Sequence, residues 1–110
     1  MAKDIEILLG YILDSIEELE KHVTDLSHED FMQSTLVQDA VMRRLEIIGE
    51  AVNNLPNKLK ADNSEIPWRD IADMRNLLIH EYFGVDIELV WETVQKDIPP
   101  LKKKIQELQG

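Results

Sequence analysis

The sequence contains no cysteine among its 110 residues, and it has only four glycines, four prolines and six aromatic side chains. The lack of cysteine excludes disulfides, thiolate metal sites and a cysteine nucleophile. No apolar run approaches the ~20 residues that a membrane-spanning helix needs. Acidic residues begin at Asp4, which is unlike a secretory signal. We therefore expect a cytoplasmic protein with no membrane partner.

Positive charge is also scarce: 22 Asp and Glu outnumber 12 Lys and Arg, so the formal net charge is −10. Such a chain is a poor general partner for nucleic acid, because phosphate binding favours a positive surface. The charge is uneven, however. Residues 1–30 contain nine acids and two lysines, a net −7, whereas all four arginines lie between Arg43 and Arg75. A local basic site in the middle of the chain is compatible with the overall acidity.

Helical periodicity is what the sequence has in abundance. An apolar stripe with three- and four-residue steps over residues 5–23 predicts a first helix. Ser27 and Asp30 form a capping-box pattern, and a second helix is predicted over residues 31–55, where a proline ends it. Residues 56–66 are predicted to be a polar connection.

The second half of the chain is predicted to be helical as well. A third helix should run from Pro67 to about Phe83, with Gly84 as its stop. Asp86 is a good N-cap for a fourth helix, and Pro99 and the proline after it interrupt or restart that helix. The predicted fold is a single all-α domain over residues 1–110, a bundle of four to five helices.

The third predicted helix carries unusual side chains. At about 100° per residue, Arg75 and Tyr82 fall on an apolar stripe, where a guanidinium is costly unless it is paired or reaches a solvated cleft. A neighbouring stripe is wholly polar and comprises Arg69, Asp73, Asn76 and His80. Asn76 and His80 are one turn apart and can address one ligand, while Asp73 is a candidate to orient the imidazole.

Residues 75–82, Arg-Asn-Leu-Leu-Ile-His-Glu-Tyr, match the motif of HEPN-domain toxins of the HepT type: Arg, four to six residues, His, any residue, Tyr. The chain resembles this family over nearly its whole length. Further matching segments are Ile48-Gly49-Glu50-Ala51, the run from Pro67 to Asn76, Tyr82-Phe83-Gly84-Val85-Asp86, Val90-Trp91 and Asp97-Ile98-Pro99-Pro100-Leu101.

The resemblance implies an all-α HEPN homodimer that acts as the toxin of a type VII toxin–antitoxin pair. It implies metal-independent RNA cleavage by Arg75 and His80, with no cofactor in this chain. The implied partner is an MntA-like nucleotidyltransferase antitoxin. This partner would use ATP to transfer AMP to the motif tyrosine, which is Tyr82 here.

Four further residues are candidate RNA contacts on the basis of their charge or position. They are Asn76, Arg69, Arg43 and Arg44. For the two adjacent arginines, pairing with Glu46 or Asp39 is an equally good expectation. Glu46 and Glu50 lie one turn apart without a histidine that would complete a metal site, so we expect them to be solvated or salt-bridged.

Two other classes of function stay open at this level. The first is a non-catalytic HEPN protein, a nucleotide- or substrate-binding subunit that partners a minimal nucleotidyltransferase. The second is a purely structural helical dimer in which Arg75 forms a buried ion pair. A metal site is not expected, because His22 and His28 are six residues apart and do not follow a metal-binding spacing.

Overall fold

The computed structural model describes residues 3–110, apart from the side chains of Lys3 and Tyr82, and this part of the chain contains helices and no strands. The α-helices are α1 (Lys3–Val23), α2 (His28–Gln33), α3 (Thr35–Asn53), α4 (Asn57–Asp62), α5 (Trp68–His80), α6 (Ile87–Glu92) and α7 (Ile98–Gln109). A 3₁₀ turn, η1 (Tyr82–Gly84), and a π-helical turn, η2 (Thr93–Asp97), join the later helices. The predicted all-α fold is confirmed.

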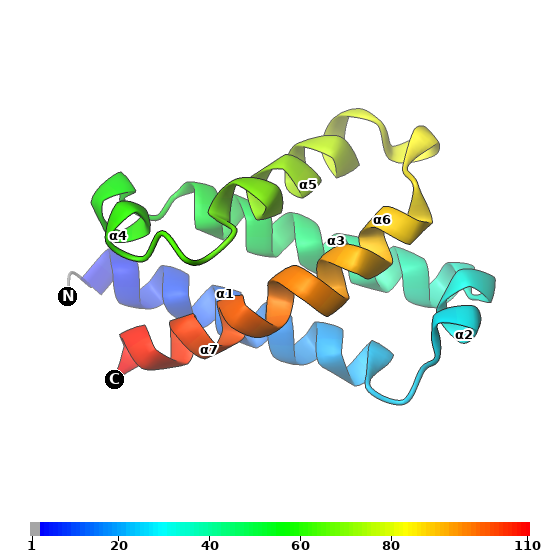
Figure 1. Ribbon diagram of the computed structural model, residues 1–110, viewed down its shortest axis with the longest axis horizontal. Coiled ribbons are helices and arrows are strands. Elements are labelled where there is room, and N and C mark those ends of the chain that lie inside the picture. Colours follow the sequence, from blue (N-terminus) through cyan, green and yellow to red (C-terminus); the bar gives the residue numbers. More distant parts are fainter. Residues whose placement is uncertain (1–2) are drawn as a thin grey trace.

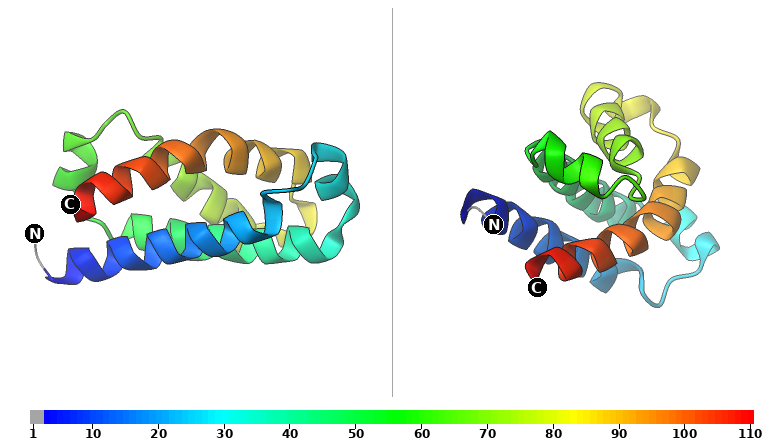
Figure 2. Two further views of the ribbon diagram at one scale, coloured as in Figure 1. Left: turned by 90° about the horizontal axis from the view of Figure 1, so that it is seen from below. Right: turned by 60° about the vertical axis from the view of Figure 1, so that its left-hand side comes forward.

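Four helical arms form the bundle: α1, α3, α5 and the continuous run α6–η2–α7 (Figure 1). The central arm is α3, which packs against α1 on one side and α5 on the other, as both views in Figure 2 agree. The last arm crosses over α1 through α7 and over α5 through η2. The short α2 contacts α6 and closes one end of the bundle, while α4 lies at the opposite end (Figure 1).

The apolar stripes of the four arms meet in one core. The largest fully buried side chains come from every arm and include Leu9, Ile12, Ile16, Leu19, Val41, Ile48, Val52, Leu78, Val90, Leu101 and Ile105. Burial of such a side chain typically contributes about 1.5–3 kcal/mol. These contacts set the rotation of each helix, so they also decide which face of α5 points to solvent.

The predicted second helix is wrong at its start, because the helix is interrupted at Ser34. This residue has an extended conformation (φ −112°, ψ 98°), and its hydroxyl accepts a hydrogen bond from the Val37 N–H at 3.2 Å. A serine side chain that caps the backbone in this way competes with continuous helix. The predicted capping box is confirmed: Ser27 Oγ accepts from the Asp30 N–H at 3.1 Å, and an Asp30 carboxylate oxygen accepts from the Ser27 N–H at 3.4 Å.

The predicted polar connection contains a helix, α4, in which Lys58 and Asp62 form an ion pair of 2.9 Å across one turn. The third predicted helix ends at His80, earlier than expected. Glu81 leaves the helical region (φ −132°, ψ 38°), and the tighter turn η1 then redirects the chain toward α6. Pro67 is the N-cap of α5 rather than part of its first turn. Residue 82 is therefore not on the α5 stripe, contrary to the prediction.

The predicted start and restart of the last arm are confirmed. An Asp86 carboxylate oxygen accepts a hydrogen bond from the Glu88 N–H at 3.0 Å and caps α6. Pro99 and Pro100 lie in the first turn of α7, where their missing N–H groups cost least. The π-helical turn just before them lets the Ile98 N–H donate to the Thr93 carbonyl. In the described residues, no helix combines the length and apolar character that a membrane span requires.

Candidate functional site

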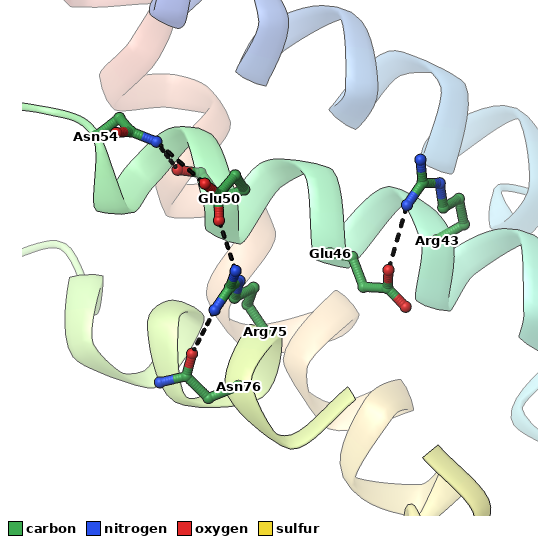
Figure 3. A network of polar contacts seen from close by, with 6 residues as sticks. All are labelled: Arg43, Glu46, Glu50, Asn54, Arg75 and Asn76. Atoms are coloured by element: carbon green, nitrogen blue, oxygen red, sulfur yellow. Dashed lines mark hydrogen bonds and ion pairs between the residues drawn. The ribbon is translucent and has the colours of Figure 1, made fainter. Parts of the chain in front are cut away.

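Arg75 lies where α5 faces α3, and its side chain is only 25% exposed. Its Nη2 atom is 2.7 Å from Oε2 of Glu50 on α3, and its Nη1 atom donates to Oδ1 of Asn76 at 2.9 Å (Figure 3). The expectation that a guanidinium on this face needs a partner or a solvated cleft is confirmed. The partner comes from a residue 25 positions earlier in the chain.

Glu50 is itself braced by the next turn of α3. The Asn54 amide donates to the Glu50 carbonyl at 2.8 Å and to its carboxylate at 3.4 Å, as Figure 3 shows. Four side chains from two helices thus form one polar chain, Asn54–Glu50–Arg75–Asn76. The expectation that Glu50 is salt-bridged is confirmed, but its place beside the motif arginine was not predicted. The only signal in the sequence was the Gly49-Glu50-Ala51 segment.

The polar chain borders a groove with a volume of about 470 Å³, which lies over α1, α3 and α5. The floor and walls are partly apolar, and Arg43 and Arg75 bring two guanidinium groups to it. The full lining comprises Leu8, Tyr11, Arg43, Glu46, Ile47, Glu50, Ala51, Asn54, Arg75 and Ile79. A groove with arginine side chains and apolar surface suits a phosphate that carries a flat base or sugar.

The other arginines differ in whether they line the groove. Arg43 lines the groove, and its Nη1 atom is 3.3 Å from Oε2 of Glu46, so the expected pairing is confirmed, while RNA contact by Arg43 stays a prediction. Arg44 instead acts on α1: the pKa of Glu18 is lowered mainly by a hydrogen bond from Lys21, with a smaller contribution from the Arg44 charge.

Arg69, near the start of α5, is almost fully exposed, and its Nε atom is 3.9 Å from an Asp73 carboxylate oxygen. It does not line the groove. The structure therefore separates both Arg44 and Arg69 from Arg75 within one chain.

His80 is the last residue of α5 and is exposed, as are the other members of the predicted polar stripe. In the described part of the chain it has no hydrogen bond or ion pair, so neither Asp73 nor Asn76 orients its imidazole. Five residues separate it from Arg75, which corresponds to about 140° around the helix and about 7.5 Å along it. Within this chain, Arg75 and His80 therefore lie on different sides of α5.

Tyr82 begins the turn η1, two residues after His80. Its side chain lies outside the described part of the structure, so the prediction that Tyr82 receives AMP rests on the sequence.

A second groove, of about 520 Å³, lies between α5 and the α6–η2 segment and is predominantly acidic. Its lining includes Asp70, Asp73, Glu92 and Asp97 with a single cation, Lys96. Burial, together with the charge of Asp70, raises the pKa of Asp97. This groove is unsuited to a phosphate, whereas in the Arg75 groove each of the two carboxylates is paired with an arginine, so we take the Arg75 groove as the candidate site. Among the described residues, no three His, Asp or Glu side chains gather into a group that could hold a metal ion.

Comparison with known proteins agrees with the motif. The family described as "Ribonuclease HepT-like" matches residues 12–108. A protein of Thermococcus cleftensis named "Probable ribonuclease HepT" is 49% identical over 108 residues, which cover 98% of each chain. A putative RNase of Caldanaerobacter subterraneus is 47% identical over 100 residues, which cover 91% of this chain and 89% of that protein.

A longer protein of Methanocaldococcus jannaschii, named as a gamma-glutamylcyclotransferase and putative RNase, is 50% identical over 108 residues. The match covers 98% of this chain but only 49% of that protein, so this chain spans about half of its length. No solved structure gives a significant match. The family match over residues 12–108 and the near-complete coverage of two of these relatives lead to one conclusion: the chain belongs to the HepT-like ribonuclease family.

Proposed function

We propose that this protein is a metal-independent endoribonuclease whose site contains Arg75 and His80. The observation that carries the proposal is the Arg75 guanidinium, held between Glu50 and Asn76 at the wall of a groove that also has apolar surface. An arginine fork binds a phosphate through two parallel hydrogen bonds and stabilises the extra negative charge of a phosphorane-like state.

The proposed reaction uses the nucleophile that RNA itself supplies. The 2′-oxygen attacks the adjacent phosphorus and its proton passes to a base, while the bond from phosphorus to the 5′-oxygen breaks and that oxygen gains a proton. Histidine has the side chain whose ordinary pKa suits both transfers near neutral pH, so we assign this chemistry to His80. The products are a 2′,3′-cyclic phosphate and a 5′-hydroxyl end.

A homodimer is part of the proposal, because Arg75 and His80 diverge around α5 within one chain. A two-fold pair that places the two α5 helices side by side would bring two arginines and two histidines to one cleft. Exposed apolar side chains around the groove support this arrangement: Tyr11 is 58% exposed and Ile79 is 46% exposed. Asn76 and Arg43 would then contact RNA beside the reacting phosphate, with Arg44 and Arg69 at greater distance.

The role in the cell that we propose is that of a toxin neutralised by an MntA-like nucleotidyltransferase. Transfer of AMP from ATP to the Tyr82 hydroxyl would add bulk and negative charge two residues from His80, and both would repel RNA. The support for this step is the motif itself. We expect the modified protein to gain the mass of one or more AMP units and to lose ribonuclease activity, whereas a Tyr82→Phe protein should resist inactivation.

The deciding experiment is incubation of the purified protein with RNA in the presence and absence of a chelator. We expect cleavage that survives the chelator, leaves cyclic phosphate ends and is lost in Arg75→Ala and His80→Ala. Wild-type rates in either variant would show that the site is wrong, and loss of activity with the chelator would point to a metal. RNA binding without cleavage would favour the alternative of a non-catalytic subunit beside a nucleotidyltransferase.

A further inference from the structure

We propose that Glu50 is a positioning residue: its carboxylate, placed by the close approach of Gly49 to α5, sets the orientation in which Arg75 meets a phosphate. The assignment rests on the proposed ribonuclease function, because it gives Arg75 a phosphate to bind. Glu50 itself is not expected to touch the reacting atoms. It acts through the guanidinium.

The two helices approach closely at Gly49. A Cβ atom added to this residue would lie 2.3 Å from the Cβ of Arg75 and 2.9 Å from its Cγ. A side chain at position 49 would therefore push α5 away from α3. Glycine is unfavourable inside a helix relative to alanine, so the close approach supplies the reason for its presence here. The next residue along α3 is then within reach of the Arg75 head group.

The contacts of Arg75 restrict how its guanidinium is oriented. An arginine has five N–H donors. Nη1 donates a hydrogen bond to Asn76, Nη2 forms an ion pair with Glu50, and Nε is buried without a partner in the described residues. N–H groups therefore remain on both terminal nitrogens, as a bidentate phosphate contact requires. Glu50 and Asn76 together restrict the rotation of the guanidinium, and Asn54 restricts Glu50.

The carboxylate should affect catalysis and binding in opposite ways. It lies 2.7 Å from the cation that would hold the phosphate, so it partly neutralises that cation and repels an incoming anion. At the same time it fixes the geometry on which the rate of the reaction depends. Removing it should therefore lower kcat while leaving KM for RNA unchanged or lower. Loss of a directly binding residue would instead raise KM.

The experiment compares Glu50→Ala and Glu50→Gln with wild type in steady-state RNA cleavage. For Glu50→Ala we expect kcat to fall roughly 10- to 100-fold, as for misplaced catalytic groups in general, without an increase in KM. Glu50→Gln should recover much of the rate, because its amide oxygen can take the place of the carboxylate oxygen beside Nη2 of Arg75. The matched control is Asp62→Asn, which removes a carboxylate from an ion pair on α4. The side chain of Asp62 is 60% exposed and that of Glu50 is 57% exposed, so the two sites are comparable. Wild-type kcat in Glu50→Ala, or an increased KM as the main effect, would overturn the assignment.

A second measurement separates this inference from the proposed function. The Nε–H signal of Arg75 in NMR spectra, assigned by its loss in Arg75→Lys, should show a restricted side chain in wild type and in Glu50→Gln, and an averaged one in Glu50→Ala. If wild type does not cleave RNA, the proposed function fails, and this signal still tests the positioning. If the protein cleaves RNA but the signal is equally ordered without Glu50, only the positioning role fails.

Discussion

Charged side chains in this protein differ in how well their surroundings compensate them. Arg75 is mostly buried but has an acidic partner and an amide oxygen. Asp97 is in the opposite situation, because burial and the nearby Asp70 both disfavour its charge, and only Lys96 opposes them. Its carboxylate also makes no capping hydrogen bond at the start of α7. Uncompensated charge of this kind opposes folding.

Asp97→Asn should stabilise the protein near neutral pH, by roughly 0.5 kcal/mol as is usual for partly exposed sites. The raised pKa means that the folded state binds the Asp97 proton more tightly than the unfolded state does. The cost of ionisation is therefore present in full at neutral pH. It fades as the pH falls through the folded-state pKa toward the ordinary value of 3.8.

Urea unfolding of wild type and variant at several pH values measures the difference. Glu65→Gln provides the contrast, because a hydrogen bond from Lys104 lowers the pKa of Glu65. That substitution should destabilise at neutral pH, and its effect should disappear as the pH falls below the lowered pKa. If both variants change stability in the same direction at neutral pH, the electrostatic account of Asp97 is wrong.

The position of each helix depends on how closely its neighbours can approach it. A close approach between α3 and α5 depends on Gly49, because the aliphatic part of Arg75 occupies the space that a side chain at Gly49 would need. By contrast, Gly10 on α1 has open space around the position of its Cβ. The two glycines have the same helical context and opposite tertiary surroundings. Substitutions at the two positions therefore distinguish the intrinsic cost of glycine in a helix from the need for space at the α3–α5 contact.

Gly49→Ala should destabilise the protein by about 1–3 kcal/mol, the usual range for an overpacked contact, because the added methyl group overlaps the Arg75 side chain. Gly10→Ala should instead stabilise by about 0.5–1 kcal/mol, since alanine is the better helix former and nothing obstructs it. Both values can be measured by urea denaturation. Equal effects of the two substitutions would mean that α5 moves freely to accept a larger residue at position 49.

The whole molecule presents an apolar surface next to its candidate site. Tyr11 and Ile79 line the groove and are substantially exposed, as is Ile7, one turn before Tyr11 on α1. Apolar side chains gathered beside a groove often mark a contact surface. This is the face on which we place the partner protomer of the proposed dimer.

Ile79→Asp should convert a dimer into a monomer, because it places a charge in an apolar contact, and RNA cleavage should be lost with it. Sedimentation or light scattering measures the mass, and the cleavage assay runs on the same samples. Leu36→Asp is the control, since Leu36 is more exposed, at 82%, but lies at the start of α3 and does not line the groove. A wild-type protein that cleaves RNA as a monomer would contradict the proposed two-fold cleft.

Local patterns in the sequence were sufficient for the all-α fold, the first helix, the capping box at Ser27 and the polar face of α5. Each of these depends on neighbours within about one or two helical turns, where periodicity and side-chain capping act directly. The motif from Arg75 to Tyr82 was also a local pattern. It led to the family to which the chain belongs.

The tertiary structure decided which residues meet across helices. Nothing within a few residues of Arg75 indicated that its partner is Glu50, because the contact depends on how α3 and α5 pack and on the absence of a side chain at Gly49. The end of α5 at His80 was also missed, because Glu81 leaves the helical region and η1 turns the chain toward α6. The break at Ser34, by contrast, has a local cause, since the Ser34 hydroxyl caps α3. Helix periodicity determines which face of a helix is apolar, whereas only packing determines what that face meets.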